Sequence, residues 1–104
     1  MKISALKEKN TNEMRVSISP DSIGLFKRLG FEVIVEEGAG ENSGYPDHKY
    51  LDLGATIVSR EQCLDADVCL CVNIPKLQDL ENLKEESILI GILNPFENKN
   101  FFEV

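Results

Sequence analysis

Residues 7–40 read KEKNTNEMRVSISPDSIGLFKRLGFEVIVEEGAG and hold, in order, a polar loop, a helix, an apolar strand and a glycine turn. Residues 19–21 (Ser-Pro-Asp) predict a helix start, because serine caps a first turn, proline fits the first helical position and aspartate meets the positive end of the helix dipole. Gly30 predicts the helix end. Residues 33–35 are apolar at every position, which is typical of a strand covered on both faces in a parallel sheet.

The same alternation of strand and helix patterns continues through the chain. It predicts an α/β fold with a doubly wound, mainly parallel five-stranded sheet, a Rossmann-like or flavodoxin-like half-lobe formed as one domain over residues 1–104. The expected strands are 2–6, 32–36, 55–58, 67–72 and 87–93. The expected helices are 19–29, with apolar positions Ile23, Phe26 and Leu29; 46–53; one beginning at Ser59 with a capping box to Gln62; 77–83; and one after residue 95.

Bulk properties exclude several classes of protein. The formal net charge of −7 repels phosphate backbones and anionic lipid, so we expect neither nucleic-acid nor membrane-surface binding. No apolar run approaches the length of a membrane span, and the first ten residues lack the apolar block of a signal peptide. We therefore expect a cytoplasmic protein.

The metal-ligating residue types do not converge in the sequence. Cys69 and Cys71 alternate within a predicted strand, so they share one face of the sheet, and we interpret them as small core residues. Cys63 makes the cysteine count odd, which argues against a disulfide framework. His48 lies on a predicted surface helix with no partner by local spacing. We expect no metal site and no catalytic residue from these patterns.

Arg15 is the best single candidate for a ligand contact. It follows the first strand by a loop, and ligands of open α/β sheets bind outside the carboxyl ends of the strands. An arginine fork there suits a carboxylate or phosphate group. The other interpretation is an ion pair with Glu8 or Glu13 that holds the loop, and the residues alone favour the ion pair. Asn73 and Asn94 end the fourth and fifth strands, where each suits a turn or a ligand contact.

The glycines at positions 38, 40 and 44 imitate a dinucleotide fingerprint without matching it. The sixth place is Ser43, and the turn follows the second strand instead of the first. The acidic residues 36, 37 and 41 would repel a pyrophosphate. We therefore expect a tight turn with no bound cofactor.

Several ordered motifs together resemble the N-terminal domain of the alanine dehydrogenase/pyridine nucleotide transhydrogenase family. The family opens with a Lys-Glu pair, then N-E-x-R-V, then Ser/Thr-Pro, a helix that ends at glycine, and E-V-x-V-E-x-G-A-G. The chain departs at Ser4 and Leu6, where the family has glycine and proline. The matching segments are 7–8, 12–16, 19–20, 29–36, 38–40, 53–58, 66–68 and the strand that ends at Pro75.

The resemblance divides into two branches. Alanine dehydrogenases supply an arginine for the substrate carboxylate, which Arg15 matches, together with a lysine after the fourth strand and a histidine after the fifth. Those two positions hold Asn73 and Asn94 here, so the acid/base group of alanine oxidation is missing. The V-N-x-P pattern at 72–75 resembles the α subunit of proton-translocating NAD(P) transhydrogenase.

That branch implies a function for a longer parent subunit. Its α subunit holds NAD(H) in a second domain and passes hydride to NADP(H) on a partner β subunit, while a membrane component couples the transfer to proton movement. The implied parent is a homodimer at the periphery of the inner membrane. We interpret this chain as an incomplete N-terminal domain that has no hydride-transfer activity, binds no cofactor by itself and leaves apolar surface bare. The alternatives are the N-terminal piece of an alanine dehydrogenase and a non-catalytic binding or scaffold module.

Overall fold

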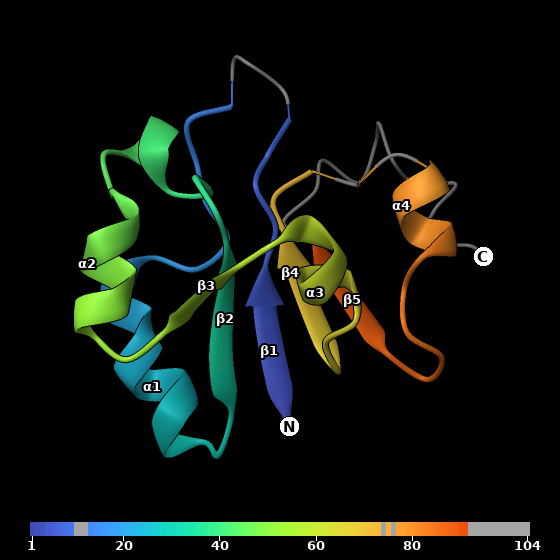
Figure 1. Cartoon of the computed structure of the whole chain (residues 1–104), viewed down its shortest axis with the longest axis horizontal. Helices are drawn as coiled ribbons and strands as arrows, with labels where there is room; N and C mark the ends of the chain where they lie inside the picture. Colours follow the sequence, from blue (N-terminus) through green and yellow to red (C-terminus); the bar gives the residue numbers. More distant parts are fainter. Residues whose placement is uncertain (10–12, 74, 76, 92–104) are drawn as a thin grey trace.

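A computed structural model of the chain describes residues 1–9, 13–73, 75 and 77–91. The expected last helix lies outside these residues, as do positions 92–93 of the fifth strand. Short helices and 3₁₀ turns alternate with short strands throughout (Figure 1). In order they are β1 (Lys2–Ala5), η1 (Pro20–Ser22), α1 (Ile23–Arg28), β2 (Glu32–Glu36), η2 (Glu41–Ser43), α2 (Asp47–Asp52), β3 (Thr56–Val58), α3 (Arg60–Leu64), β4 (Val68–Cys71), α4 (Leu77–Glu81) and β5 (Ile88–Gly91).

The five strands form one sheet in the order β3-β2-β1-β4-β5, with every neighbouring pair parallel. The predicted α/β fold with a parallel five-stranded sheet is therefore confirmed. β1 lies at the centre, where Ile3 pairs with Val33 of β2 and with Val68 of β4. The order reverses between β1 and β4, which makes this pair the topological switch point of the sheet.

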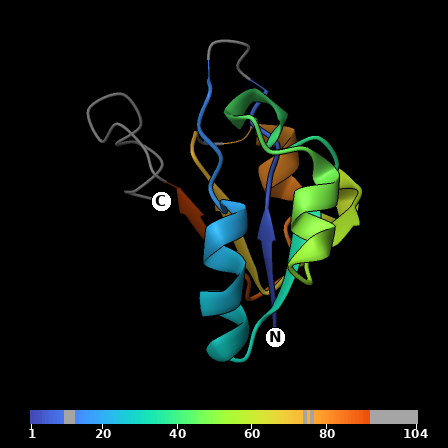
Figure 2. The ribbon, with the colours of Figure 1, turned by 90° about the vertical axis from the view of Figure 1, so that its left-hand side faces the viewer.

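Alternate residues of each strand belong to opposite faces. On the first face, Ile3 and Ala5 of β1 join Val33 and Val35 of β2 in a core that α1 covers through Ile23. On the other face, Leu6, Cys69 and Cys71 pack against residues of α3 and of the segment after α4. α1 and α3 accordingly lie on opposite sides of the sheet (Figure 2). Burial on both faces explains why the central strands are almost continuously apolar.

The three cysteines belong to the second of these cores, as the alternation of Cys69 and Cys71 predicted. Cys63 reaches the same cluster from α3. All three thiols are free and buried. Burial raises the pKa of Cys63 and Cys71 to about 12, so neither thiol ionises near neutral pH. They are apolar packing groups in this structure.

The helix signals in residues 19–30 are correct in part. Ser19 occupies the cap position, but its hydroxyl makes no capping hydrogen bond; Ser22 Oγ instead donates to the Ser19 carbonyl oxygen, and the helix begins as a 3₁₀ turn. Leu29 was expected on the buried stripe and is 64% exposed, because the helix ends at Arg28. Gly30 ends it with a positive φ of 93°, and the ring of Phe31 folds back against Phe26.

The later helix signals agree more closely with the structure. Ser59 and Gln62 form the predicted capping box at the start of α3. Gly54 has the positive φ expected of the residue that stops α2. Among the described residues, no helix combines the length and the apolar character needed to cross a bilayer.

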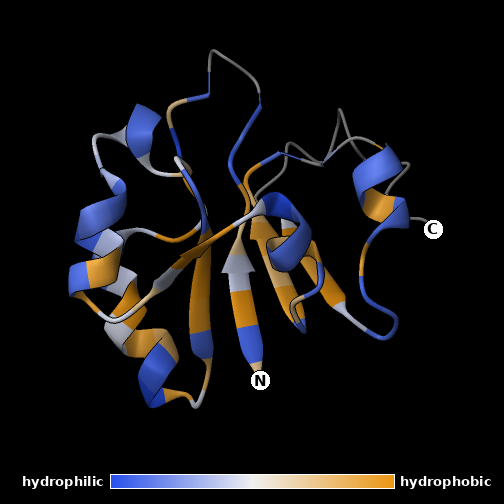
Figure 3. Cartoon of the chain, viewed as in Figure 1, coloured by the Kyte–Doolittle hydropathy of each residue, from blue (hydrophilic) through white to orange (hydrophobic). Residues whose placement is uncertain are grey.

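The first face of the sheet is incompletely covered at β5. Ile88 and Ile90 point to that face and are 56% and 51% exposed. The exposed strand is apolar in character (Figure 3). The described residues therefore leave an apolar strip beside β4, as the sequence predicted in general terms.

The close approach of two tyrosines explains the second glycine of the 38–44 turn. A Cβ at Gly40 would lie 2.6 Å from Tyr50 Oη and 2.7 Å from the Tyr45 carbonyl oxygen. Tyr50 itself is fully buried, and its hydroxyl donates a 2.8 Å hydrogen bond to the Ile18 carbonyl oxygen. Gly40 is thus required by packing between the turn and α2.

We therefore expect Gly40→Ala to lower the free energy of unfolding by about 1–3 kcal/mol, because an added methyl group has no space there. Gly24→Ala is the matched control: its Cβ would meet nothing closer than Arg28 Nη2 at 3.9 Å. Alanine inside a helix stabilises by about 1 kcal/mol relative to glycine. Urea denaturation of both variants measures the difference, and equal stabilities would contradict this account of Gly40.

Candidate functional site

The carboxyl ends of β1 and β4 meet at the switch point, at the top of the sheet in Figure 1. Glu8 follows β1, and its carboxylate accepts hydrogen bonds of 2.9 Å from the backbone N–H groups of Val72 and of Asn73. These two residues directly follow β4. A buried carboxylate that accepts two backbone N–H bonds is firmly held. Glu8 therefore closes the switch-point crevice from within the chain.

The side-chain amide of Asn73 extends this contact to a third segment. Its Nδ2 donates to Glu13 Oε1 at 2.8 Å and to Glu8 Oε1 at 3.4 Å. An amide nitrogen carries two hydrogens, so both are used on carboxylates. Asn73 was predicted to lie where a ligand could be met, and the structure places it there with its donors already engaged.

Arg15 and Glu13 form a two-bond ion pair next to Asn73. Arg15 Nε and Nη2 donate to the two carboxylate oxygens of Glu13 at 2.9 Å each, and the Arg15 backbone N–H adds a third bond of 2.9 Å. The Arg15 side chain is 65% exposed while that of Glu13 is 9% exposed. Of the two partners suggested for Arg15, Glu13 makes the contact. Glu8 binds the backbone after β4 instead.

The backbone of this loop is held from the other side as well. Asn42 Nδ2 donates to the Glu13 carbonyl oxygen at 3.4 Å, and Ser43 Oγ donates to the Met14 carbonyl oxygen. Arg15 therefore extends from a loop that η2 and β4 both restrain. We call Glu8, Glu13, Arg15 and Asn73 the switch-point cluster.

The hydrogen bonds within the cluster stabilise the charged form of Glu13. Those from the Arg15 side chain, the Arg15 backbone and Asn73 lower the pKa of Glu13 from 4.5 to about 2. The cluster holds two carboxylates and one guanidinium group, so it is net negative when Glu8 is ionised. This balance does not attract an anion beyond the reach of Arg15 itself.

A second polar cluster lies at the same edge of the sheet and was not predicted. Arg60 bonds Glu36 at the end of β2 and Asp79 of α4, with N–O distances of 2.7 and 2.8 Å. Its Nη1 also donates to the Lys7 carbonyl oxygen at 3.1 Å. The sequence gives one weak signal for it, an arginine placed directly after the capping serine at a strand end.

The remaining candidate residues do not join either cluster. His48 is exposed on α2, and Gly38 is held by a hydrogen bond to Asp47 Oδ1. Asn94 lies outside the described residues. Within those residues, no group of three or more potential metal ligands comes together.

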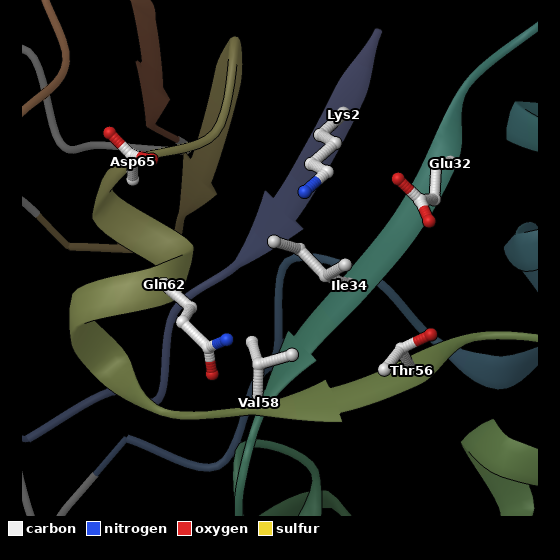
Figure 4. A pocket seen from close by; sticks show the side chains of 7 residues that line it. All are labelled: Lys2, Glu32, Ile34, Thr56, Val58, Gln62 and Asp65. Atoms are coloured by element: carbon white, nitrogen blue, oxygen red, sulfur yellow. The ribbon is translucent and has the colours of Figure 1, made fainter.

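A shallow hollow of about 270 Å³ lies on the α3 side of the sheet, toward the amino ends of the strands (Figure 4). Ile34 and Val58 form its apolar base, and Lys2, Glu32 and Asp65 lie around it with opposite charges. Because ligands of such sheets bind at the carboxyl ends, the hollow is a gap left by the short helix α3 and is a weaker candidate than the switch point.

The fold and the switch-point cluster together define a doubly wound α/β domain with polar groups gathered at its switch point. Residues 4–104 match the family model described as alanine dehydrogenase/PNT, N-terminal domain. The chain belongs to this family.

Curated relatives come from both branches of the family. The NAD(P) transhydrogenase subunit alpha of Rickettsia prowazekii, in the first of its parts, is 38% identical over 99% of this chain. Alanine dehydrogenase 1 of Staphylococcus aureus is 32% identical over 99% of the chain. In each case the alignment covers 28% of the relative, so this chain spans less than a third of their length.

Solved structures also resemble the chain. The transhydrogenase from Sinorhizobium meliloti has a TM-score of 0.88 and 35% identity over 96% of this chain and 30% of its own. An L-alanine dehydrogenase has a TM-score of 0.85 and 26% identity over 99% of this chain and 29% of its own. The parent enzymes of this domain are therefore oxidoreductases in both branches.

Glu13 gives the cluster a predicted pH dependence. Its pKa is depressed by folding, so the stability it contributes is present above about pH 4.5 and is lost as the pH falls toward 2. We expect the stability advantage of the wild type over Glu13→Gln to be complete at neutral pH and to disappear across that window. Glu37→Gln, at an exposed carboxylate, is the control. Chemical denaturation at several pH values measures both, and a pH-independent advantage would contradict the role given to Glu13.

Proposed function

We propose that the chain is the N-terminal part of the NAD(H)-binding α subunit of a proton-translocating NAD(P) transhydrogenase. Hydride transfer between NAD(H) and NADP(H) is the activity of the parent complex, and the chain alone is inactive. The similarity to the Rickettsia α subunit supports this branch, as does the chemistry at the end of β4.

The observation that carries the proposal is the amide of Asn73. Oxidation of an amino acid requires a group that accepts and returns a proton beside the substrate. Asn73 does not titrate, and its two N–H bonds are directed at Glu8 and Glu13. Hydride transfer between two nicotinamides moves no proton to the protein, so it needs orientation and exclusion of water from the domain and no acid or base.

Charge at the carboxyl edge supports a nucleotide site in another domain. Glu8, Glu13 and Glu36 lie at this edge, while Arg15 and Arg60 are paired with carboxylates. A pyrophosphate would meet negative charge here. In the proposal NAD is bound by the second domain of the parent subunit, and Arg15 is the described group in the switch-point cluster that is placed to reach an anionic ligand.

The proposed partners follow from the same branch. They are the remaining domain of the α subunit, a membrane component and an NADP-binding β subunit, with two α subunits forming a homodimer. The exposed strip at β5 is an apolar surface suited to one of these contacts. The location would be the cytoplasm, at the periphery of the inner membrane.

The test uses the full product of the gene together with its membrane partners. We expect NADPH to reduce an NAD analogue in that complex and alanine to support no NAD reduction. For the 104-residue chain alone, calorimetry should show no tight NAD binding, because the described residues form no phosphate cradle. Alanine-dependent turnover without transhydrogenation would overturn the branch, and tight NAD binding by the chain would overturn the division of labour between domains.

The second candidate is an alanine dehydrogenase, favoured by the 32% identical Staphylococcus relative. Its test restores the missing groups through the pair Asn73→Lys and Asn94→His in the full product. We expect no gain in alanine turnover, because a lysine at position 73 would be neutralised by Glu8 and Glu13. A measurable gain would revive this candidate, whereas a scaffold module would show neither activity.

A further inference from the structure

Arg60 is the point at which three separate segments meet. It is the first residue of α3, and its side chain is 18% exposed. The guanidinium contacts Glu36 at the end of β2, Asp79 in α4, and the carbonyl oxygen of Lys7 after β1. A planar guanidinium has five N–H donors in fixed directions, so these contacts are geometrically dependent on one another.

On one side, Arg60 holds α4. This helix has five residues, too few to be stable without tertiary contacts. Asp79 turns inward and receives two bonds from Arg60, from Nε at 3.2 Å and from Nη2 at 2.8 Å. Leu77 at the start of the helix is 68% exposed. The ion pair is therefore a major attachment of α4 to the body of the domain.

On the other side, Arg60 holds the residue that precedes the switch-point cluster. The Lys7 backbone is fixed twice, since its N–H donates to Glu36 Oε1 at 2.9 Å and its carbonyl oxygen accepts from Arg60. Glu36 is also a partner of Arg60, so both contacts of Lys7 depend on the same guanidinium. The next residue, Glu8, carries the carboxylate that binds the end of β4.

We propose that Arg60 couples α4 to the switch-point cluster, so that displacement of α4 loosens the Lys7–Glu8 segment and, through Asn73, the Glu13–Arg15 pair. If Asp79 moves away, the guanidinium loses two charge-assisted bonds in a site with little water. It then turns toward solvent and gives up the Lys7 carbonyl oxygen, which lies on its opposite edge. A molecule that binds at α4 therefore acts on the cluster without touching it.

This coupling goes beyond the proposed hydride-transfer function and does not depend on it, because it concerns only contacts within the chain. The simpler alternative is that the Arg60 contacts contribute to overall stability alone. The two differ in where an effect is felt. Coupling changes specific amides far from the altered residue, whereas a loss of overall stability changes all core amides together.

The experiment is amide hydrogen exchange by NMR on the 104-residue chain carrying Asp79→Asn, which removes one charge at constant size. We expect the amides of Lys7, Val72 and Asn73 to exchange at least about tenfold faster, within the usual range of coupling effects. The core amides of Ala5 and Val35 should not change.

Asp67→Asn is the matched control. It removes an aspartate that pairs with Lys84 at 2.8 Å beside the amino end of β4. The same chemical change there should leave the amides of Lys7, Val72 and Asn73 at their wild-type rates. Equal acceleration by both variants would overturn the proposal.

Coupling must also act in the reverse direction. Glu8→Gln weakens the contact to β4 at constant size, so it should accelerate exchange in α4, read at the Asn82 amide that donates to the Asp79 carbonyl oxygen. Arg60→Lys keeps the charge and removes the planar fork, and should loosen both sides at once. Unchanged switch-point amides in Asp79→Asn, an unchanged α4 in Glu8→Gln, or uniform acceleration of all core amides would each refute the coupling.

Discussion

The contact between Glu8 and the backbone after β4 is the constraint on which the rest of the carboxyl edge depends. β1 and β4 are neighbours in the sheet but are separated in the chain by β2, β3 and the helices α1 to α3. Where such strands diverge, the backbone N–H groups that follow them need acceptors. Glu8 satisfies two of them at 2.9 Å each, and so converts the place where an open α/β sheet normally receives a ligand into a closed joint.

The two polar clusters form one continuous layer because they share residues 7 and 8. Arg60 and Glu36 hold the backbone of Lys7, and the side chain of Glu8 continues the layer to Asn73, Glu13 and Arg15. Most of the charged groups in this layer face inward and are satisfied within the chain. Arg15 differs from them, since its fork is held by Glu13 while its side chain remains largely exposed. A domain of this kind is suited to positioning a reaction whose reactive groups are carried by cofactors bound elsewhere.

The sequence was sufficient for the fold and only partly sufficient for the site. Strands and helix ends follow from local signals, such as the apolar run of 33–35 or the positive φ that Gly30 and Gly54 adopt, and these signals survive in the structure. Ser19 failed as a capping residue because a 3₁₀ turn precedes α1 and changes the geometry of the first N–H groups. The partners of Glu8 and Arg60 could not be read locally: Glu8 meets residues 64 and 65 positions away, and Arg60 meets carboxylates on both sides of it in the chain. Only the strand order brings these groups together.

The central position of β1 has a consequence for synthesis on the ribosome. The first strand to emerge can pair with β2 early, but its other edge, at Ile3, waits for Val68. Until the residues after β4 have left the exit tunnel, Leu6 lacks its packing partners Cys69 and Cys71, and the carboxylate of Glu8 lacks its two N–H donors. The nascent chain therefore holds an unfinished half-sheet for most of its translation, and completes its centre late, in a step set by the slow formation of non-local parallel contacts.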